Sequence, residues 1–199
     1  KKELEMTKKL EKKLKTLFEK EDGVREKSLK LSREVGRMAA DSIKKIHQRN
    51  FKEAEKEIED ALAILKDAKK TLKECPEIFY AGFLHAAEKE LAEAVVTLEI
   101  IKNGSLPDPD DYGFDYKSYL HGLCESNGEL RRYMLDEIRK GEIGKCEKML
   151  GMMDDIYYFL LNFQYTDAIT RSLRRQVDYV RSMLERARSE VTLAKINMR

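Results

Sequence analysis

Two pairs of glutamates have a spacing that puts both members of each pair on the same side of a helix. Glu90 and Glu93 are three residues apart, and Glu125 and Glu129 are four apart. The Cβ atoms of such pairs are about 5–6 Å apart in a helix, so their charges repel each other and need compensation. Carboxylate oxygens are the ligands that Mg²⁺ and Mn²⁺ prefer. A cluster of the four glutamates could therefore hold a divalent metal ion for chemistry on a phosphate.

An alternative interpretation is that the four glutamates are solvated surface residues. Most charged side chains on helices face water, and Lys89, Arg131 and Arg132 are near enough in the sequence to neutralise them. Small residues on the same sides of the two segments would let a backbone, a metal or a phosphate approach closely; they are Ala86, Ala94, Thr97, Gly122 and Ser126. Spacing alone leaves both interpretations open.

The segments that must position these acids are predicted to be long helices, because apolar residues recur in them at helical spacing. Gly and Pro number only 10 and 3 among 199 residues, and 38% of the residues are charged, which favours helices over sheet and turn. We predict an all-α fold, a bundle of about seven long helices in a single domain over residues 1–199. The expected helices cover residues 1–20, 24–47, 50–72, 76–101, 116–140, 142–163 and 168–198.

Turn residues separate these helices. The break at residues 21–23 ends the first, and Asn50 with Glu53 forms a capping box that begins the third. Residues 103–115 contain two prolines and read as a long connecting loop. Residues 1–22 carry a narrow apolar stripe among many lysines, which indicates a peripheral or partner-facing helix, or equally a solvated end.

Cations are grouped at both ends of the chain. Counting Lys and Arg against Asp and Glu, residues 75–115 carry −7 while the whole chain carries +2. Four cations line one side of the second predicted helix and could follow a phosphate backbone; they are Lys30, Arg33, Arg37 and Lys44. Glu34 and Asp41 interleave with them, so salt bridges within the helix are the alternative. The last helix is rich in arginine, which suits phosphate binding or a solvated or subunit-facing surface.

The order of short motifs resembles the translin and TRAX family. The motifs are KLSRE at residues 30–34, ELAEA at 90–94 and ESNGELRR at 125–132, followed by a break near Gly141 and a long basic last helix. The likeness covers the chain from about residue 24 onward. It implies a translin-like helical fold and a hollow homo-oligomer, commonly an octamer, whose acids face an inner chamber. A mixed assembly with a translin partner is the alternative to a homo-oligomer.

TRAX-type members are metal-dependent RNA endonucleases, and the resemblance extends to their acidic residues. Their catalytic acids are two glutamates three apart, then an aspartate followed four residues later by a glutamate. These match Glu90 and Glu93, then Glu125 and Glu129, with Glu125 replacing the usual aspartate. The resemblance implies that all four are catalytic residues and ligands of Mg²⁺ or Mn²⁺. Arg132 matches the arginine after the family's GEL and would hold phosphate or pair with Glu129.

The expected function is therefore a metal-dependent endoribonuclease similar to compact archaeal TRAX-like members. The alternatives are a translin-like protein that binds RNA or single-stranded DNA without cutting it, and a helical scaffold. His85 and His121 precede the acids by one turn or more and could approach them, but we expect them to be hydrogen-bonded parts of the fold. Three cysteines without metal-ligand spacing favour a reducing cytoplasm. No apolar run approaches the roughly 20 residues of a membrane span, and no signal-peptide pattern opens the sequence, so we expect a protein that is neither secreted nor embedded in a membrane.

Overall fold

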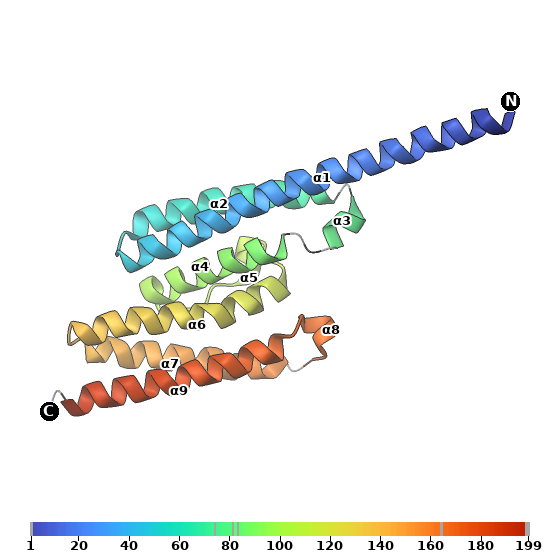
Figure 1. Ribbon diagram of the computed structural model, residues 1–199. Coiled ribbons are helices and arrows are strands. Elements are labelled where there is room, and N and C mark those ends of the chain that lie inside the picture. The colour runs from blue at the N-terminus through green and yellow to red at the C-terminus, as the bar shows by residue number, and fades with distance from the viewer. Residues whose placement is uncertain (1, 74, 81, 83, 164, 198–199) are drawn as a thin grey trace.

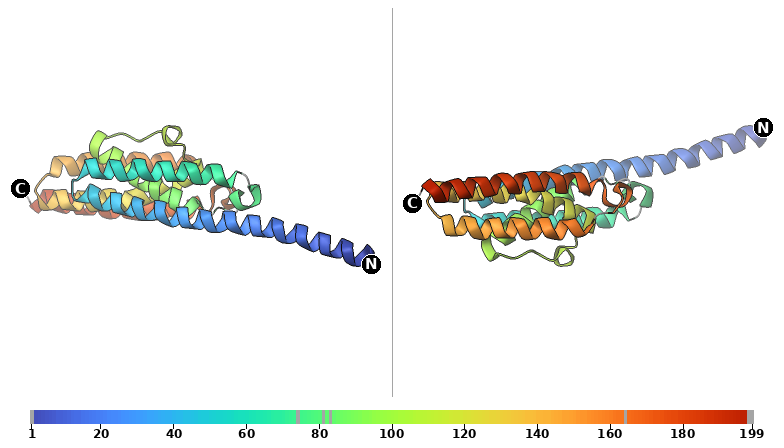
Figure 2. Two further views of the ribbon diagram at one scale, coloured as in Figure 1. Left: turned by 90° about the horizontal axis from the view of Figure 1, so that it is seen from above. Right: turned by 90° about the horizontal axis from the view of Figure 1, so that it is seen from below.

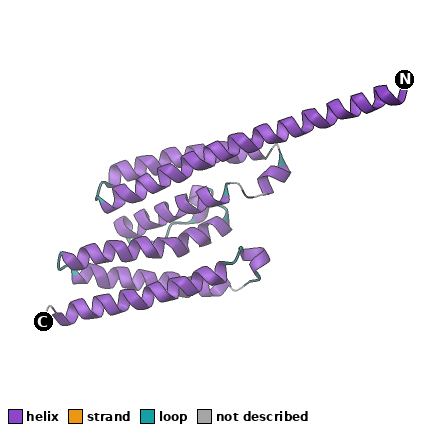
Figure 3. Ribbon diagram, in the orientation of Figure 1, coloured by secondary structure: helices purple, strands orange, loops and turns teal. Residues whose placement is uncertain are grey.

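The structure, a computed structural model, describes residues 2–73, 75–80, 82, 84–163 and 165–197. Figure 3 shows helices joined by short loops, with no strand in these ranges, so the all-α prediction is confirmed. The helices are α1 (Lys2–His47), α2 (Phe51–Leu72), α3 (Pro76–Tyr80), α4 (His85–Asn103), α5 (Pro109–Tyr112), α6 (Tyr116–Arg139), α7 (Ile143–Leu160), α8 (Asp167–Thr170) and α9 (Leu173–Asn197), with a 3₁₀ turn η1 at Leu161–Phe163.

The predicted break at residues 21–23 is wrong, because α1 runs through it as one helix. Glycine inside a helix costs only about 1 kcal/mol relative to alanine, and a Cβ added to Gly23 would meet no atom within 4 Å. Arg25 also forms an ion pair with Asp22 at 3.3 Å, which ties the two sides of the expected break together. The described chain therefore has six long helices where about seven were predicted.

Other boundaries differ where the backbone takes a left-handed conformation. The helix predicted over residues 76–101 is divided into α3 and α4, with Gly82 between them at φ 80°. The last predicted helix is divided into α8 and α9 by Arg171 and Ser172, at φ 53° and 64°; its expected end at residue 198 lies outside the described residues. The Asn50 side chain makes no capping hydrogen bond, so the capping box is also wrong.

The helices are stacked in layers, as Figure 1 shows: α1 lies beside α2, followed by α4, then α6, then α7 with α9. The segment 104–115, which contains α5, returns along the bundle, so α4 and α6 run in the same direction. Buried apolar residues of all six long helices form one connected hydrophobic cluster; members with almost no exposed surface include Val35, Leu65, Leu91, Leu123, Met153 and Leu184.

The N-terminal half of α1 extends beyond the other helices, which both views of Figure 2 show. Its apolar stripe is exposed in the single chain: Met6, Leu10, Leu14, Leu17 and Phe18. The separate helix expected over residues 1–20 is thus the exposed first part of α1. None of the helices in the described part of the chain combines the length and the apolar character that crossing a membrane requires.

Candidate functional site

The two helices that carry the acids touch each other through their backbones. A Cβ added to Gly122 of α6 would lie 2.7 Å from the carbonyl oxygen of Lys89 and 2.8 Å from the backbone nitrogen of Glu93, both on α4. Only a residue without a side chain permits this approach, because real Cβ contacts are not that short. Glycine at position 122 therefore places α6 directly against the turn of α4 that holds Glu90 and Glu93.

Glu93 is the half-buried centre of the acidic group. Burial is the largest cause and repulsion from Glu125, Glu129 and Glu90 follows in that order; together, and against the opposing effect of Lys89, they raise the pKa of Glu93 to about 8. The structure thus brings the four predicted carboxylates into one electrostatic cluster. A proton on Glu93, or a cation beside it, relieves the repulsion among them.

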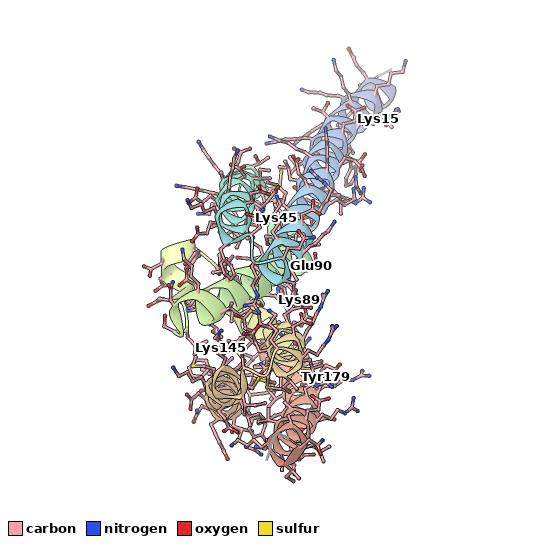
Figure 4. The ribbon with its side chains drawn as sticks, turned by 90° about the vertical axis from the view of Figure 1, so that its left-hand side faces the viewer. Lys15, Lys45, Lys89, Glu90, Lys145 and Tyr179 are labelled. Carbon is pink, nitrogen blue, oxygen red and sulfur yellow. The ribbon has the colours of Figure 1, made fainter. Side chains whose placement is uncertain are left out.

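Glu90 is more exposed and lies against α1. A Cβ added to Gly36 would lie 2.7 Å from its Oε2 atom, so the Glu90 carboxylate occupies the space beside this glycine. Figure 4 shows Glu90 close to α1, with Lys89 next to it on the side of α6. Arg33 and Arg37 lie within one helical turn of Gly36, so the acidic cluster reaches the middle of the predicted basic stripe.

Two of the acids have partners within the fold. The Lys89 ammonium donates to Oε1 of Glu125 at 2.6 Å, and His47 donates from Nε2 to Oε2 of Glu129 at 2.5 Å. This hydrogen bond from His47 lowers the pKa of Glu129. Arg132 lies 3.7 Å from the same oxygen. The hydrogen bond from His47 therefore favours the charged form of Glu129, and Lys89 pairs with Glu125, whereas Glu93 has no cationic partner among the described residues to offset the repulsion.

His47 is the residue that sequence reasoning missed. It lies 82 positions from Glu129 in the chain, and its side chain is 7% exposed. Its Nδ1 atom is buried without a hydrogen-bond partner among the described residues. No local spacing signals this contact, because it depends on how the end of α1 meets α6. The sequence also suggested Arg131 as a neutralising residue, but Arg131 instead pairs with Glu190 of α9.

The donor set suits a hard divalent cation in kind, since it offers four carboxylates, and repulsion at Glu93 provides a reason to bind one. In the present side-chain conformations, no three His, Cys, Asp or Glu residues of the described chain converge closely enough to ligate a metal. Glu90 and Glu93 form no hydrogen bond or ion pair with other described residues. A metal ion could thus bind these two carboxylates without breaking any such contact, whereas binding to Glu125 would require its ion pair with Lys89 to break.

The cysteine and the two histidines considered near the acids are buried or hydrogen-bonded, which makes them poor nucleophiles or bases. Burial raises the pKa of the Cys124 thiol to about 12, so it is not a thiolate at neutral pH. Burial is also the main cause that lowers the pKa of His85 to about 4, and its Nδ1 lies 2.7 Å from the Ser118 hydroxyl. His121 donates from Nε2 to the carbonyl oxygen of Thr170 at 2.8 Å. Both histidines are hydrogen-bonded within the fold, as expected.

The predicted nucleic-acid-binding cations lie on the surface. Lys30, Arg33, Arg37, Lys44 and Arg132 are all exposed. Arg37 lies 3.8 Å from Asp41 one turn along the helix, which is the intrahelical pair that the sequence offered as an alternative. Such an exposed pair contributes little to stability, so the arginine can exchange this partner for a phosphate.

Comparison with known proteins identifies the family of the chain through relatives of similar sequence and structure. No family model matches the chain. An uncharacterised protein of Methanocaldococcus jannaschii is 33% identical over 174 residues, which cover 85% of this chain and 76% of that protein. The structure of AfC3PO in complex with duplex RNA is 33% identical, with a TM-score of 0.86 over 95% of this chain and 97% of that chain.

Two further solved structures have the same fold as this chain. The crystal structure of AfC3PO is 33% identical, with a TM-score of 0.87 over 95% of this chain and 98% of that chain. Apo-NeC3PO is 24% identical with a TM-score of 0.77 over 94% of this chain and 95% of that chain, and shows the fold alone. AfC3PO is a translin/TRAX-family component. At this identity and coverage, the chain belongs to the translin/TRAX family, as a TRAX-like member.

Proposed function

We propose that this chain is a metal-dependent endoribonuclease that cleaves RNA phosphodiester bonds at the four glutamates. The observation that carries the proposal is the position of Glu93, which is half-buried beside Glu125, Glu129 and Glu90, so that its pKa is raised to about 8. A structural carboxylate is usually paired or exposed, because burying it among other acids destabilises the fold. Strongly shifted groups of this kind are found preferentially at functional sites.

Glu90, Glu93 and Glu125 would bind one or two Mg²⁺ or Mn²⁺ ions, with Glu129 as a further ligand or as their neighbour. The metal supplies positive charge for the phosphate and a bound water of lowered pKa. Glu93 is protonated at neutral pH without a cation and must lose that proton on binding one, so metal affinity rises with pH. His47 holds the Glu129 carboxylate in one orientation through its Nε2 hydrogen bond. Lys89, when released from Glu125, is free to pair with a phosphate oxygen.

RNA is the substrate that the surroundings support best. The basic stripe of α1 passes the acids at Gly36, and Arg132 is exposed beside Glu129. The similar chain AfC3PO is described in a complex with duplex RNA. We extend the family resemblance to assembly as well, and propose a hollow homo-octamer with the acids inside. The exposed apolar stripe at the start of α1 provides surface for contacts between subunits.

A second candidate is a translin-like protein that binds RNA or single-stranded DNA without cutting it. The observation that favours it is that Lys89 and His47 already pair with two of the four acids. In this case both contacts are permanent, and the site never binds a metal. RNA binding would then be unaffected by a chelator.

Cleavage of an end-labelled RNA in Mg²⁺, Mn²⁺ or EDTA separates the two candidates. Glu93→Gln and Glu125→Gln should abolish metal-dependent cutting while RNA binding survives. Glu99→Gln is the matched control, because Glu99 lies on the same helix as Glu93 but contacts Asn103 and Tyr112 instead. Binding without cutting in every metal would leave the non-catalytic candidate.

A further inference from the structure

A cavity of about 500 Å³ opens beside Glu125. Cys124 and Glu125 of α6 form one wall, and Arg175 and Tyr179 of α9 form the other, with Arg171 at the turn before α9. Its volume falls within the range of about 300–1,000 Å³ that is typical of small-molecule sites. The cavity is therefore large enough for one nucleotide and shares a carboxylate with the acidic cluster.

The wall formed by α9 combines cationic, aromatic and hydrogen-bonding groups. Arg175 and Tyr179 are four residues apart and so lie on the same side of the helix. Tyr179 is 63% exposed, and the Arg175 side chain forms no ion pair within the described chain. Gln176 also lines the cavity. The wall formed by α9 thus offers an unpaired guanidinium and an exposed aromatic ring to a ligand.

The turn before α9 is held in a costly conformation. Arg171 and Ser172 are consecutive residues with positive φ, at 53° and 64°. Left-handed backbone is unfavourable for residues with a Cβ, and it persists where the surroundings enforce it, often at functional sites. Here the Thr170 carbonyl accepts the hydrogen bond from His121 of α6, and the Arg171 N–H donates to the Asp167 carbonyl at 2.7 Å. These contacts fix the turn that lines one end of the cavity, while the Arg171 guanidinium extends to Gly82.

We propose that this cavity is a nucleotide-positioning subsite next to the scissile phosphate. Arg175 binds the neighbouring phosphodiester, because its guanidinium can engage two phosphate oxygens. Tyr179 stacks on the base of the same nucleotide, which requires that this base is unpaired. Figure 4 shows Tyr179 farther along the molecule than Glu90 and Lys89, toward α9. The inference rests on the proposed RNA cleavage and adds which groups set the position of the strand.

Binding measured in EDTA tests the subsite without cleavage. Fluorescence anisotropy with a labelled 12-nucleotide single-stranded RNA should show about tenfold weaker binding for Tyr179→Leu, and wild-type binding for Tyr179→Phe. Arg175→Met should weaken binding by about tenfold and reduce the slope of log affinity against log salt by about 1. Arg174→Met is the matched control: it removes an equal charge from the adjacent exposed position, which does not line the cavity.

A second RNA probe, which lacks bases, tests whether Tyr179 contacts the base. An abasic ribose-phosphate strand of the same length should bind wild type and Tyr179→Leu equally. Light scattering on each variant records whether the number of subunits has changed.

The experiments distinguish a failure of the subsite proposal from a failure of the proposed RNA cleavage. Lost affinity in Arg175→Met and Tyr179→Leu supports the subsite even if no metal produces cutting. Unchanged RNA affinity in both variants overturns it even if the wild type cuts RNA. A changed subunit number with unchanged RNA affinity also overturns it and shows that this wall of α9 is a subunit contact.

Discussion

Replacing Glu93 by glutamine should stabilise the protein at alkaline pH and leave it unchanged at acidic pH. Glutamine has nearly the same shape as glutamate but carries no charge, so it removes the repulsion from Glu125, Glu129 and Glu90 without opening a cavity. The unfolded chain releases the Glu93 proton at an ordinary carboxyl pKa of 4.5, whereas the folded chain holds it to about 8. Stability of the wild type must therefore depend on pH through this one group.

The sign and size of the effect follow from that difference. Below pH 4.5 both states are protonated and Glu93 costs nothing. Between the two pKa values only the unfolded state loses the proton, so the free energy of unfolding falls as pH rises. The full difference of about 3.5 pH units corresponds to about 5 kcal/mol. Solvent screening of a half-buried side chain reduces this to about 2–3 kcal/mol above pH 8.

Urea denaturation at fixed protein concentration, in EDTA and from about pH 4.5 to 9, measures the difference directly. The gap between Glu93→Gln and wild type should be near zero at the acidic end and grow to its full value above pH 8. Glu99→Gln, on the same helix, should follow the wild-type curve. Parallel curves for wild type and Glu93→Gln would refute the reasoning, because they would mean that Glu93 titrates alike in both states. With Mn²⁺ added at pH 8, the wild type should gain more stability than Glu93→Gln, since binding to the folded state alone stabilises it.

Three other outcomes are expected. Gly122→Val should destabilise the protein by about 1–3 kcal/mol in urea denaturation, because the valine side chain would collide with the α4 backbone. In the control Gly151→Ala the added Cβ meets no atom within 4 Å, so this variant should be as stable as the wild type or more stable. An equal loss of stability in the two variants would contradict the close approach of α6 to α4. The pKa of His85, measured by NMR, should be about 4. The unfolded chain then takes up a proton at this residue near pH 6.5 while the folded chain does not, so the fold loses stability as pH falls from 6.5 toward 4. A measured pKa near 6.5 would show that burial does not control this histidine. Glu125→Asp, which restores the residue usual in the TRAX resemblance, should retain metal-dependent cleavage with a changed Mg²⁺ to Mn²⁺ ratio; complete loss of cutting would show that the longer side chain is required.

The sequence by itself determined that the chain is helical, where most of the long helices lie, and the spacing of the acids within each helix. Both depend on local geometry: helical periodicity repeats every 3.6 residues, so Glu90 with Glu93, and Glu125 with Glu129, share a side wherever the helices go. The order of these motifs was also enough to indicate the family. Local reasoning failed at Gly23, where a cost of about 1 kcal/mol does not end a helix that nothing else interrupts.

Only the tertiary structure decided what surrounds the acids. The contact of His47 with Glu129 joins residues 82 positions apart, and Glu90 reaches α1 at Gly36. Gly122 had been noted as a small residue, but its role required knowing that α6 runs alongside α4 at backbone contact. From the sequence, Arg131 and Arg132 were equally good candidates to pair with the acidic cluster. In the structure Arg131 pairs with Glu190, and Arg132 pairs with Glu129. Such pairings depend on the direction and rotation of whole helices, which are set by how six apolar faces pack together and not by any one segment.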